Sequence, residues 1–146
     1  MLEQFPDARF IHIHRDPYKV YASTLQMELA TQSLYAYQQL DKEMLDEFIL
    51  WRYKTMYDAF FEDLPMIPKG QFVEVAFSDL CNDPIGEVTR VGQEIGFDGP
   101  ELPTLQRYVD SIAGYKKNKR PPLADEVRGR VAKRWKRCFD AWGYDA

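Results

Sequence analysis

The run Phe10-Ile-His-Ile-His-Arg-Asp-Pro17 constrains the fold of this 146-residue chain more than any other stretch. Isoleucines alternate with histidines, which predicts a short buried strand at 9–14. Asp16-Pro17 combines a helix N-cap with proline at the first helical position, so a helix should follow almost directly. Arg15 therefore stands at the carboxyl end of a strand, where open α/β sheets bind their ligands. We expect this stretch to be the functional centre.

A second strand is predicted at 71–77, where the sequence is apolar and β-branched. Between the strands the sequence favours a helix from Pro17 to about Ala30 and a longer one from Lys42 to Asp63. Because strands joined by a helical crossover run parallel, the two should share one parallel sheet. Further helices are expected at 84–95, 102–112 and 124–141. The chain is thus a helix-rich α/β protein with few strands.

Three- and four-residue spacing of apolar residues predicts the buried faces of the longest helices. In 42–63 this face contains Met44, Leu45, Phe48, Ile49, Met56, Tyr57, Phe60 and Phe61. In 124–141 the apolar stripe is Val127, Val131, Trp135 and Cys138, continued by Trp142. Aromatic residues make up 14% of the chain. A core built on large rings is the simpler explanation of that content, and a stacking surface is the alternative.

The sequence argues against several classes of function. The formal net charge of −4 argues against non-specific nucleic-acid binding as the main task. Cys81 and Cys138 form neither a disulfide framework nor a CxxC metal pattern, so a reducing compartment is the simpler interpretation. No apolar run approaches the roughly 18 residues of a membrane span, and the first residues lack a signal-peptide layout. We expect a soluble cytoplasmic protein with no nucleic-acid partner and no membrane span.

Arg15 is the strongest candidate for binding a ligand. Its guanidinium presents rigidly arranged donors that bind a phosphate bidentately, and it keeps its charge. Ser23 lies eight residues on and adds a hydroxyl donor. With a helix starting at Pro17, Ser23 would lie about 9 Å further along the axis, so one phosphate touching both must lie alongside the first turns. The alternative is a buried Arg15 paired with Asp16 or with another carboxylate at the strand end.

His12 and His14 share one face of the predicted strand. As a functional pair they would bind a metal or transfer protons. The alternative is that they are ordinary strand residues beside a ligand cleft. No third ligand of a suitable type lies close in sequence, so no metal is assigned. His14, adjacent to Arg15, is kept as a candidate catalytic residue.

Two basic segments lie toward the carboxyl end of the chain. The predicted loop at 113–122 contains three lysines that are candidate ligands: Lys116, Lys117 and Lys119. Donors on such a loop can close over a polyanionic ligand, and a solvated connection between helices is the alternative. In the last helix, four basic residues fall largely off the apolar stripe: Arg128, Lys133, Lys136 and Arg137. That placement indicates a solvated basic face.

The segment at 5–23 resembles the 3′-phosphate-binding segment of the sulfotransferase family. In that family an arginine ends a strand, a proline follows closely, and a serine lies eight residues on. Arg15, Pro17 and Ser23 match that spacing. The resemblance is to the bacterial branch of the family.

Three later segments extend this resemblance, in the family's order, to about residues 5–144. Residues 75–84 resemble the family strand that is followed by Tyr-Glu-Asp-Leu and then Asp-Pro, with Phe77 in the place of the tyrosine. Residues 115–118 resemble the basic loop before the final helix. Residues 135–144 resemble the family's C-terminal ending.

The resemblance implies a P-loop-like fold with three α/β/α layers around a parallel sheet. It implies 3′-phosphoadenosine 5′-phosphosulfate (PAPS) as the donor, adenosine 3′,5′-bisphosphate as the product nucleotide and no metal. The sulfuryl group would pass to a hydroxyl or amine by in-line displacement. Arg15 and Ser23 would hold the 3′-phosphate, helped by one of the loop lysines, and Phe77 would pack against the adenine.

One part of the family pattern does not occur in these residues. There is no Gly-x-x-Gly-[Lys/Arg]-[Ser/Thr]-like run to form the 5′-phosphosulfate loop. The family's usual catalytic base also lies upstream of the arginine–serine segment. We therefore interpret 1–146 as a single, partial sulfotransferase domain, the C-terminal portion, with the N-terminal strand and P-loop missing. This explains the shortage of strands, and we expect weak or no turnover by this chain alone.

Two other hypotheses were weighed against this one. A non-catalytic binding or interaction module derived from the fold would use the basic last helix and the aromatic residues for a protein or polyanion partner. A nucleotide-kinase-like fragment is disfavoured, because no Walker-type loop or magnesium-binding carboxylate pattern is present. The expected partners are a nucleotide sulfuryl donor and an unknown acceptor, with homo-oligomerisation left open.

Overall fold

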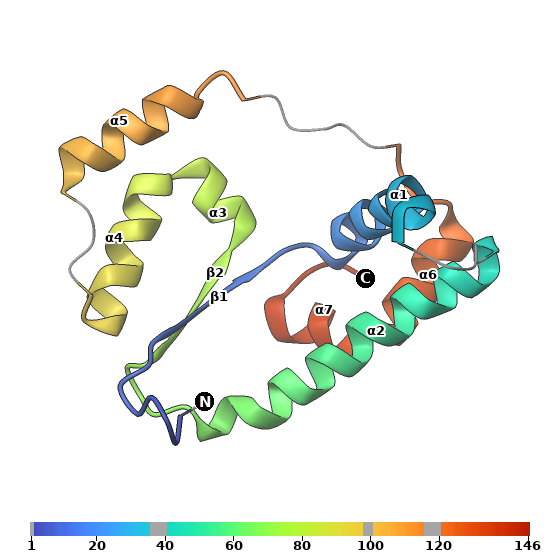
Figure 1. The fold of residues 1–146 in the computed structure, drawn as a ribbon, viewed down its shortest axis with the longest axis horizontal. Helices are drawn as coiled ribbons and strands as arrows, with labels where there is room; N and C mark the ends of the chain where they lie inside the picture. The colour runs from blue at the N-terminus through green and yellow to red at the C-terminus, as the bar shows by residue number, and fades with distance from the viewer. Residues whose placement is uncertain (1, 36–40, 98–100, 116–120) are drawn as a thin grey trace. The chain divides into compact units, whose positions relative to one another are not determined.

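The two predicted strands pair in a parallel sheet (Figure 1). A computed structural model describes residues 2–35, 41–97, 101–115 and 121–146. In it, β1 (Phe10–His14) runs beside β2 (Phe72–Ala76), with Phe10 opposite Phe72 and His14 opposite Ala76. The expected parallel pairing is confirmed. The second strand ends one residue earlier than predicted, because Phe77 already belongs to a helix.

The two strands differ in burial. Val73 and Val75 of β2 are buried, with 3% and 2% of their surface exposed. Ile11 and Ile13 lie opposite them in the register, yet each remains about half exposed. The prediction of a buried first strand is therefore wrong on this face. Helix α4 (Pro84–Ile95) packs against β2, whereas β1 is paired only along its β2 side within the described residues.

The chain divides into two compact units. One contains residues 1–15 and 64–119, with the sheet and the helices that follow it. The other contains residues 16–63 and 120–146 and is helical. The expectation of a single domain over 1–146 stays a prediction.

The described residues of the sheet-containing unit also include four helical segments: η1 (Leu64–Met66), α3 (Phe77–Asn82), α4 and α5 (Leu102–Ile112). The start of α4 is capped as the sequence predicted. The Asp83 carboxylate accepts a hydrogen bond of 2.9 Å from the backbone N–H of Gly86. A Cβ at residue 86 would lie 2.1 Å from Asp83 Oδ2, so the cap requires glycine there. Gly96 ends the helix in the left-handed conformation, with φ of 61°.

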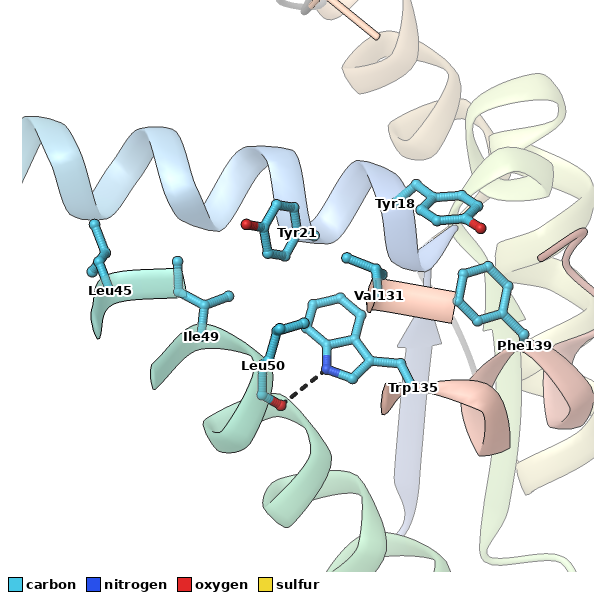
Figure 2. Packing of buried hydrophobic residues seen from close by; sticks show 8 residues of the cluster. All are labelled: Tyr18, Tyr21, Leu45, Ile49, Leu50, Val131, Trp135 and Phe139. Atoms are coloured by element: carbon cyan, nitrogen blue, oxygen red, sulfur yellow. Dashed lines mark hydrogen bonds between the residues drawn. The ribbon is translucent and has the colours of Figure 1, made fainter. Parts of the chain in front are cut away.

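The helical unit consists of α1 (Pro17–Tyr35), α2 (Lys42–Asp63), α6 (Asp125–Arg134) and α7 (Lys136–Trp142). The predicted cap of α1 is confirmed: Asp16 Oδ1 accepts a 2.9 Å hydrogen bond from the Tyr18 N–H. Figure 2 shows the core that these helices enclose. Its buried side chains are Tyr18, Tyr21, Leu45, Ile49, Leu50, Val131, Trp135 and Phe139. Four of the eight are aromatic, which supports the expectation of a core built on large rings.

Trp135 is the central side chain of this core. It is 1% exposed, and its indole N–H donates a 3.0 Å hydrogen bond to the carbonyl oxygen of Leu50 on α2 (Figure 2). The ring of Tyr53 stacks on it with 3.8 Å between centroids, and Tyr21 meets it edge-on at 5.9 Å. This residue therefore links the C-terminal helices to both α1 and α2.

Two details of the predicted helices are wrong. The last helix is not continuous, because the backbone of Trp135 leaves the helical conformation (φ −107°, ψ 19°) and separates α6 from α7. The apolar face of α2 is also narrower than predicted. Met44 and Met56 are each 54% exposed, and Phe48 is 38% exposed. α2 therefore contributes Leu45, Ile49 and Leu50 to the core.

The observed architecture is helix-rich α/β with a small parallel sheet, as the sequence predicted. Within the described ranges, no helix is both long enough and apolar enough to cross a membrane.

Candidate functional site

Arg15 follows β1 directly, and Phe77 follows β2 directly. The parallel register places His14 opposite Ala76, so these next two residues emerge at the same edge of the sheet. The guanidinium carbon of Arg15 lies over the Phe77 ring, 4.5 Å from its centroid. An arginine stacked on an aromatic face keeps its planar fork of donors oriented while its charge remains available. The structure thus brings together two residues that the sequence predicted as ligand contacts.

The Nε of Arg15 is a buried donor without a hydrogen-bond acceptor among the described residues. The structure also records no ion pair for Arg15 in the ranges it describes. Asp16, the partner considered from the sequence, accepts from the Tyr18 N–H and lies 3.6 Å from the Lys19 ammonium. Because buried donors are nearly always satisfied, an unpaired guanidinium nitrogen at a strand end fits an anionic ligand group.

His12 and His14 lie on one face of the sheet, as the alternation predicted. The Nδ1 of His12 is 3.1 Å from the Glu74 carboxylate, which stands directly opposite it in the register. The two imidazole rings are 6.2 Å apart between centroids. No group of three or more metal-ligating side chains occurs within the part of the chain that the structure describes. The site is therefore built from two histidines, a carboxylate and the neighbouring arginine.

The electrostatics around His14 favour its neutral form. Burial lowers the pKa of His14 below its ordinary value, and the nearby His12 lowers it further. The carboxylates of Glu74 and Asp79 raise the pKa of His14, but each has a smaller effect than burial. His14 is therefore a neutral imidazole at neutral pH, with the capacity to accept a proton.

Ser23 lies in α1, in the helical unit, and is half-buried. Arg15 belongs to the other unit. The pairing of Arg15 with Ser23 therefore rests on their eight-residue spacing in the sequence. Three predicted ligands lie outside the described residues: Lys116, Lys117 and Lys119.

The sequence did not single out Glu74. It lies between Val73 and Val75 in the second strand, and the parallel register puts it beside His12. Arg90 of α4 donates a 2.9 Å hydrogen bond to the Glu74 carbonyl oxygen and so connects that helix to the strand. The alternation of Glu74 with two valines was the available signal, since it indicates the polar face of a strand.

More than half of the chain matches a known protein family. Residues 1–101 match the model of the sulfotransferase family. The chain belongs to the sulfotransferase family. It is 36% identical over 147 aligned positions to the omega-hydroxy-beta-dihydromenaquinone-9 sulfotransferases Stf3 of Mycobacterium bovis and Mycobacterium tuberculosis. These alignments cover 99% of this chain and 38% of each relative.

A solved sulfotransferase has a similar fold. The crystal structure of sulfotransferase STF9 from Mycobacterium avium superposes with a TM-score of 0.75 at 21% sequence identity. The match covers 96% of this chain and 37% of that one. This chain therefore spans little more than a third of the length of these relatives. The α/β fold inferred from its sequence is that of a solved sulfotransferase.

Proposed function

We propose that this chain forms the part of a sulfotransferase that binds the 3′-phosphate of the sulfuryl donor PAPS. Family membership implies a transferase, and the stacked Arg15 supplies the anion-binding group. The single observation that carries the proposal is the buried, unpaired Nε of Arg15 at the strand end. A phosphate oxygen is the acceptor that such a donor lacks.

The remaining binding roles follow from the family resemblance and from residue chemistry. Ser23 adds a hydroxyl donor to the 3′-phosphate, and one or more of the loop lysines Lys116, Lys117 and Lys119 add charge. Phe77 packs against the adenine and supports Arg15. Aromatic stacking tolerates the loss of the family's tyrosine hydroxyl, because the ring face makes the contact. The two strands belong to the parallel sheet of a P-loop-like fold with three α/β/α layers.

In the proposed reaction a bond forms between the acceptor oxygen and sulfur while the bond from sulfur to the 5′-phosphate oxygen breaks. Arg15 and Ser23 contribute position and charge at the 3′-phosphate. His14, neutral at neutral pH, is the candidate in this chain to take up the acceptor's proton. No residues of these 146 form a glycine-rich 5′-phosphosulfate loop, so we expect little or no turnover by this chain alone.

We further propose that the acceptor group is a hydroxyl. The two Mycobacterium relatives are named for an omega-hydroxy compound, and at 36% identity they support an alcohol more than an amine.

Calorimetry with three nucleotides tests the proposal from the ligand side. Adenosine 3′,5′-bisphosphate should bind this chain saturably, adenosine 5′-monophosphate should bind roughly tenfold more weakly or worse, and guanosine 3′,5′-bisphosphate should show what the adenine contributes. Equal affinity for the first two nucleotides would contradict a 3′-phosphate site. Self-association or partner binding that ignores all three would favour the alternative of a non-catalytic interaction module.

A further inference from the structure

A cavity of about 270 Å³ opens in the helical unit, at the bend between α6 and α7 and beside α2. Five basic residues line it: Lys54, Lys133, Arg134, Lys136 and Arg137. One carboxylate, Asp58, accompanies them. None of the residues proposed to hold the nucleotide takes part.

Four residues of this basic cluster flank the bend at Trp135. Trp135 is held in the core, so Lys133 and Arg134 precede the bend while Lys136 and Arg137 follow it. Positions three and four residues apart share one side of a helix, so helical periodicity already groups Lys133 with Lys136 and Arg137. All four basic residues line one cavity together with Lys54 and Asp58 of α2.

The cluster is only partly neutralised by its own carboxylates. Lys54 pairs with Asp58, and Arg137 lies 3.7 Å from the same carboxylate. Arg134 pairs with Glu47, which Arg130 shares. These side chains are about half exposed, and exposed ion pairs of that kind add little to stability. A ligand can therefore displace them at low cost.

Lys133 has no recorded acceptor in the residues that the structure describes, and Lys136 pairs with Asp140 one turn further along α7, at 2.6 Å. Both lysines are therefore available to a ligand. Lys133 can bind it directly, and Lys136 can bind it by releasing the exposed Asp140 carboxylate. The whole chain carries a net charge of −4, so this concentration of positive charge is local. A local cationic cavity in an acidic chain attracts small anions rather than long polyanions.

We propose that this cavity binds a tetrahedral oxyanion, namely the phosphate or sulfate group of a small ligand. Its volume lies just below the roughly 300–1,000 Å³ of typical small-molecule sites, which favours a single anionic group over a whole nucleotide. The lysine and arginine donors that line the cavity match the oxygens of such a group. The site is additional to the proposed donor site and does not depend on it.

Titration of the isotope-labelled chain with inorganic phosphate, sulfate and pyrophosphate, followed by backbone amide NMR, tests this proposal. At low ionic strength the amides of residues 133–138, 54 and 58 should shift together and saturably. The double variant Lys133→Glu/Lys136→Glu should weaken binding by about tenfold or more. Its matched control is Lys42→Glu/Lys69→Glu, which alters two exposed lysines that do not line the cavity and gives the same net charge. The control should bind as the wild type does.

Each outcome decides the proposal. Shifts that do not saturate, that spread over the whole surface or that respond equally to both double variants mean non-specific charge attraction and overturn it. Saturable shifts at the cavity that only the cavity variant loses establish the site. Sedimentation with phosphatidic acid vesicles then separates the two sources of a phosphate group. Vesicle binding that free phosphate competes away indicates a lipid headgroup, and its absence indicates a soluble ligand.

Discussion

The guanidinium of Arg15 rests on the ring of Phe77, with 4.5 Å between the guanidinium carbon and the ring centroid. The two residues are 62 positions apart in the chain, and the parallel register of β1 and β2 brings them to one sheet edge. Stacking fixes the plane of the arginine without neutralising it. The Nε that remains buried and unpaired makes this pair the centre of the proposed donor site.

Changing Phe77 to leucine should weaken nucleotide binding. Leucine retains apolar bulk but removes the aromatic face, so Arg15 loses a contact worth roughly 0.5–2 kcal/mol and the adenine loses its stacking partner. Calorimetry with adenosine 3′,5′-bisphosphate should show an affinity reduced by about tenfold. The matched control is Phe77→Tyr, which restores the residue that the family has at this place. It should bind at least as well as the wild type, and a loss as large as that of leucine would contradict the stacking role.

Changing Trp135 to phenylalanine should destabilise the helical unit. The smaller ring cannot donate to the Leu50 carbonyl and leaves space beside Tyr53. We expect the free energy of unfolding to fall by roughly 1–3 kcal/mol, measured by urea titration with circular dichroism. Trp51→Phe is the control, because Trp51 is 58% exposed and its replacement should change stability by no more than about 0.5 kcal/mol. Similar losses in both variants would contradict the assignment of Trp135 to the core.

His14 should titrate below its ordinary pKa of 6.5, because burial disfavours the imidazolium. Above that pH both folded and unfolded states are neutral at this residue. As the pH falls below 6.5 the unfolded state takes up a proton first, so stability decreases until folded His14 is protonated as well. NMR titration of the imidazole C–H signals, assigned with the His14→Gln variant, measures the midpoint directly. The urea-unfolded protein is the reference, and a folded midpoint at or above the unfolded one would refute the effect.

Local signals in the sequence predicted the helix starts and the strand pairing. The caps at Asp16 and Asp83 depend on contacts within three residues, so the sequence alone contains what determines them. The parallel pairing follows from chain connectivity, because the first helices form a crossover between the two strands.

Features that depend on tertiary packing were not predictable in this way. The bend at Trp135 contains no glycine or proline that would predict it, and its indole contacts Leu50 and Tyr53 from another helix. Met44 and Met56 continue the helical periodicity of α2, yet each is 54% exposed. Residue spacing indicates which side chains can share a face but not how far the opposing surface extends.

The same distinction applies to the candidate site. Arg15 and Phe77 were both predicted as ligand contacts, but their stacking on each other requires the register of the sheet. The pairing of His12 with Glu74 also requires that register. The cationic cavity requires α2 beside the C-terminal helices, which is why the sequence indicated only a solvated basic face there.

The most direct test of the account is the affinity of the Arg15→Ala variant for adenosine 3′,5′-bisphosphate, measured by calorimetry beside the wild type. Arg107→Ala is the matched control, since Arg107 is an exposed arginine of the same unit whose recorded bonds stay within α5. Charge-assisted bonds to phosphate are worth roughly 1.5–3 kcal/mol, so Arg15→Ala should lose about 10- to 100-fold in affinity while Arg107→Ala binds normally. Equal affinities for Arg15→Ala and the wild type would contradict the donor-site assignment.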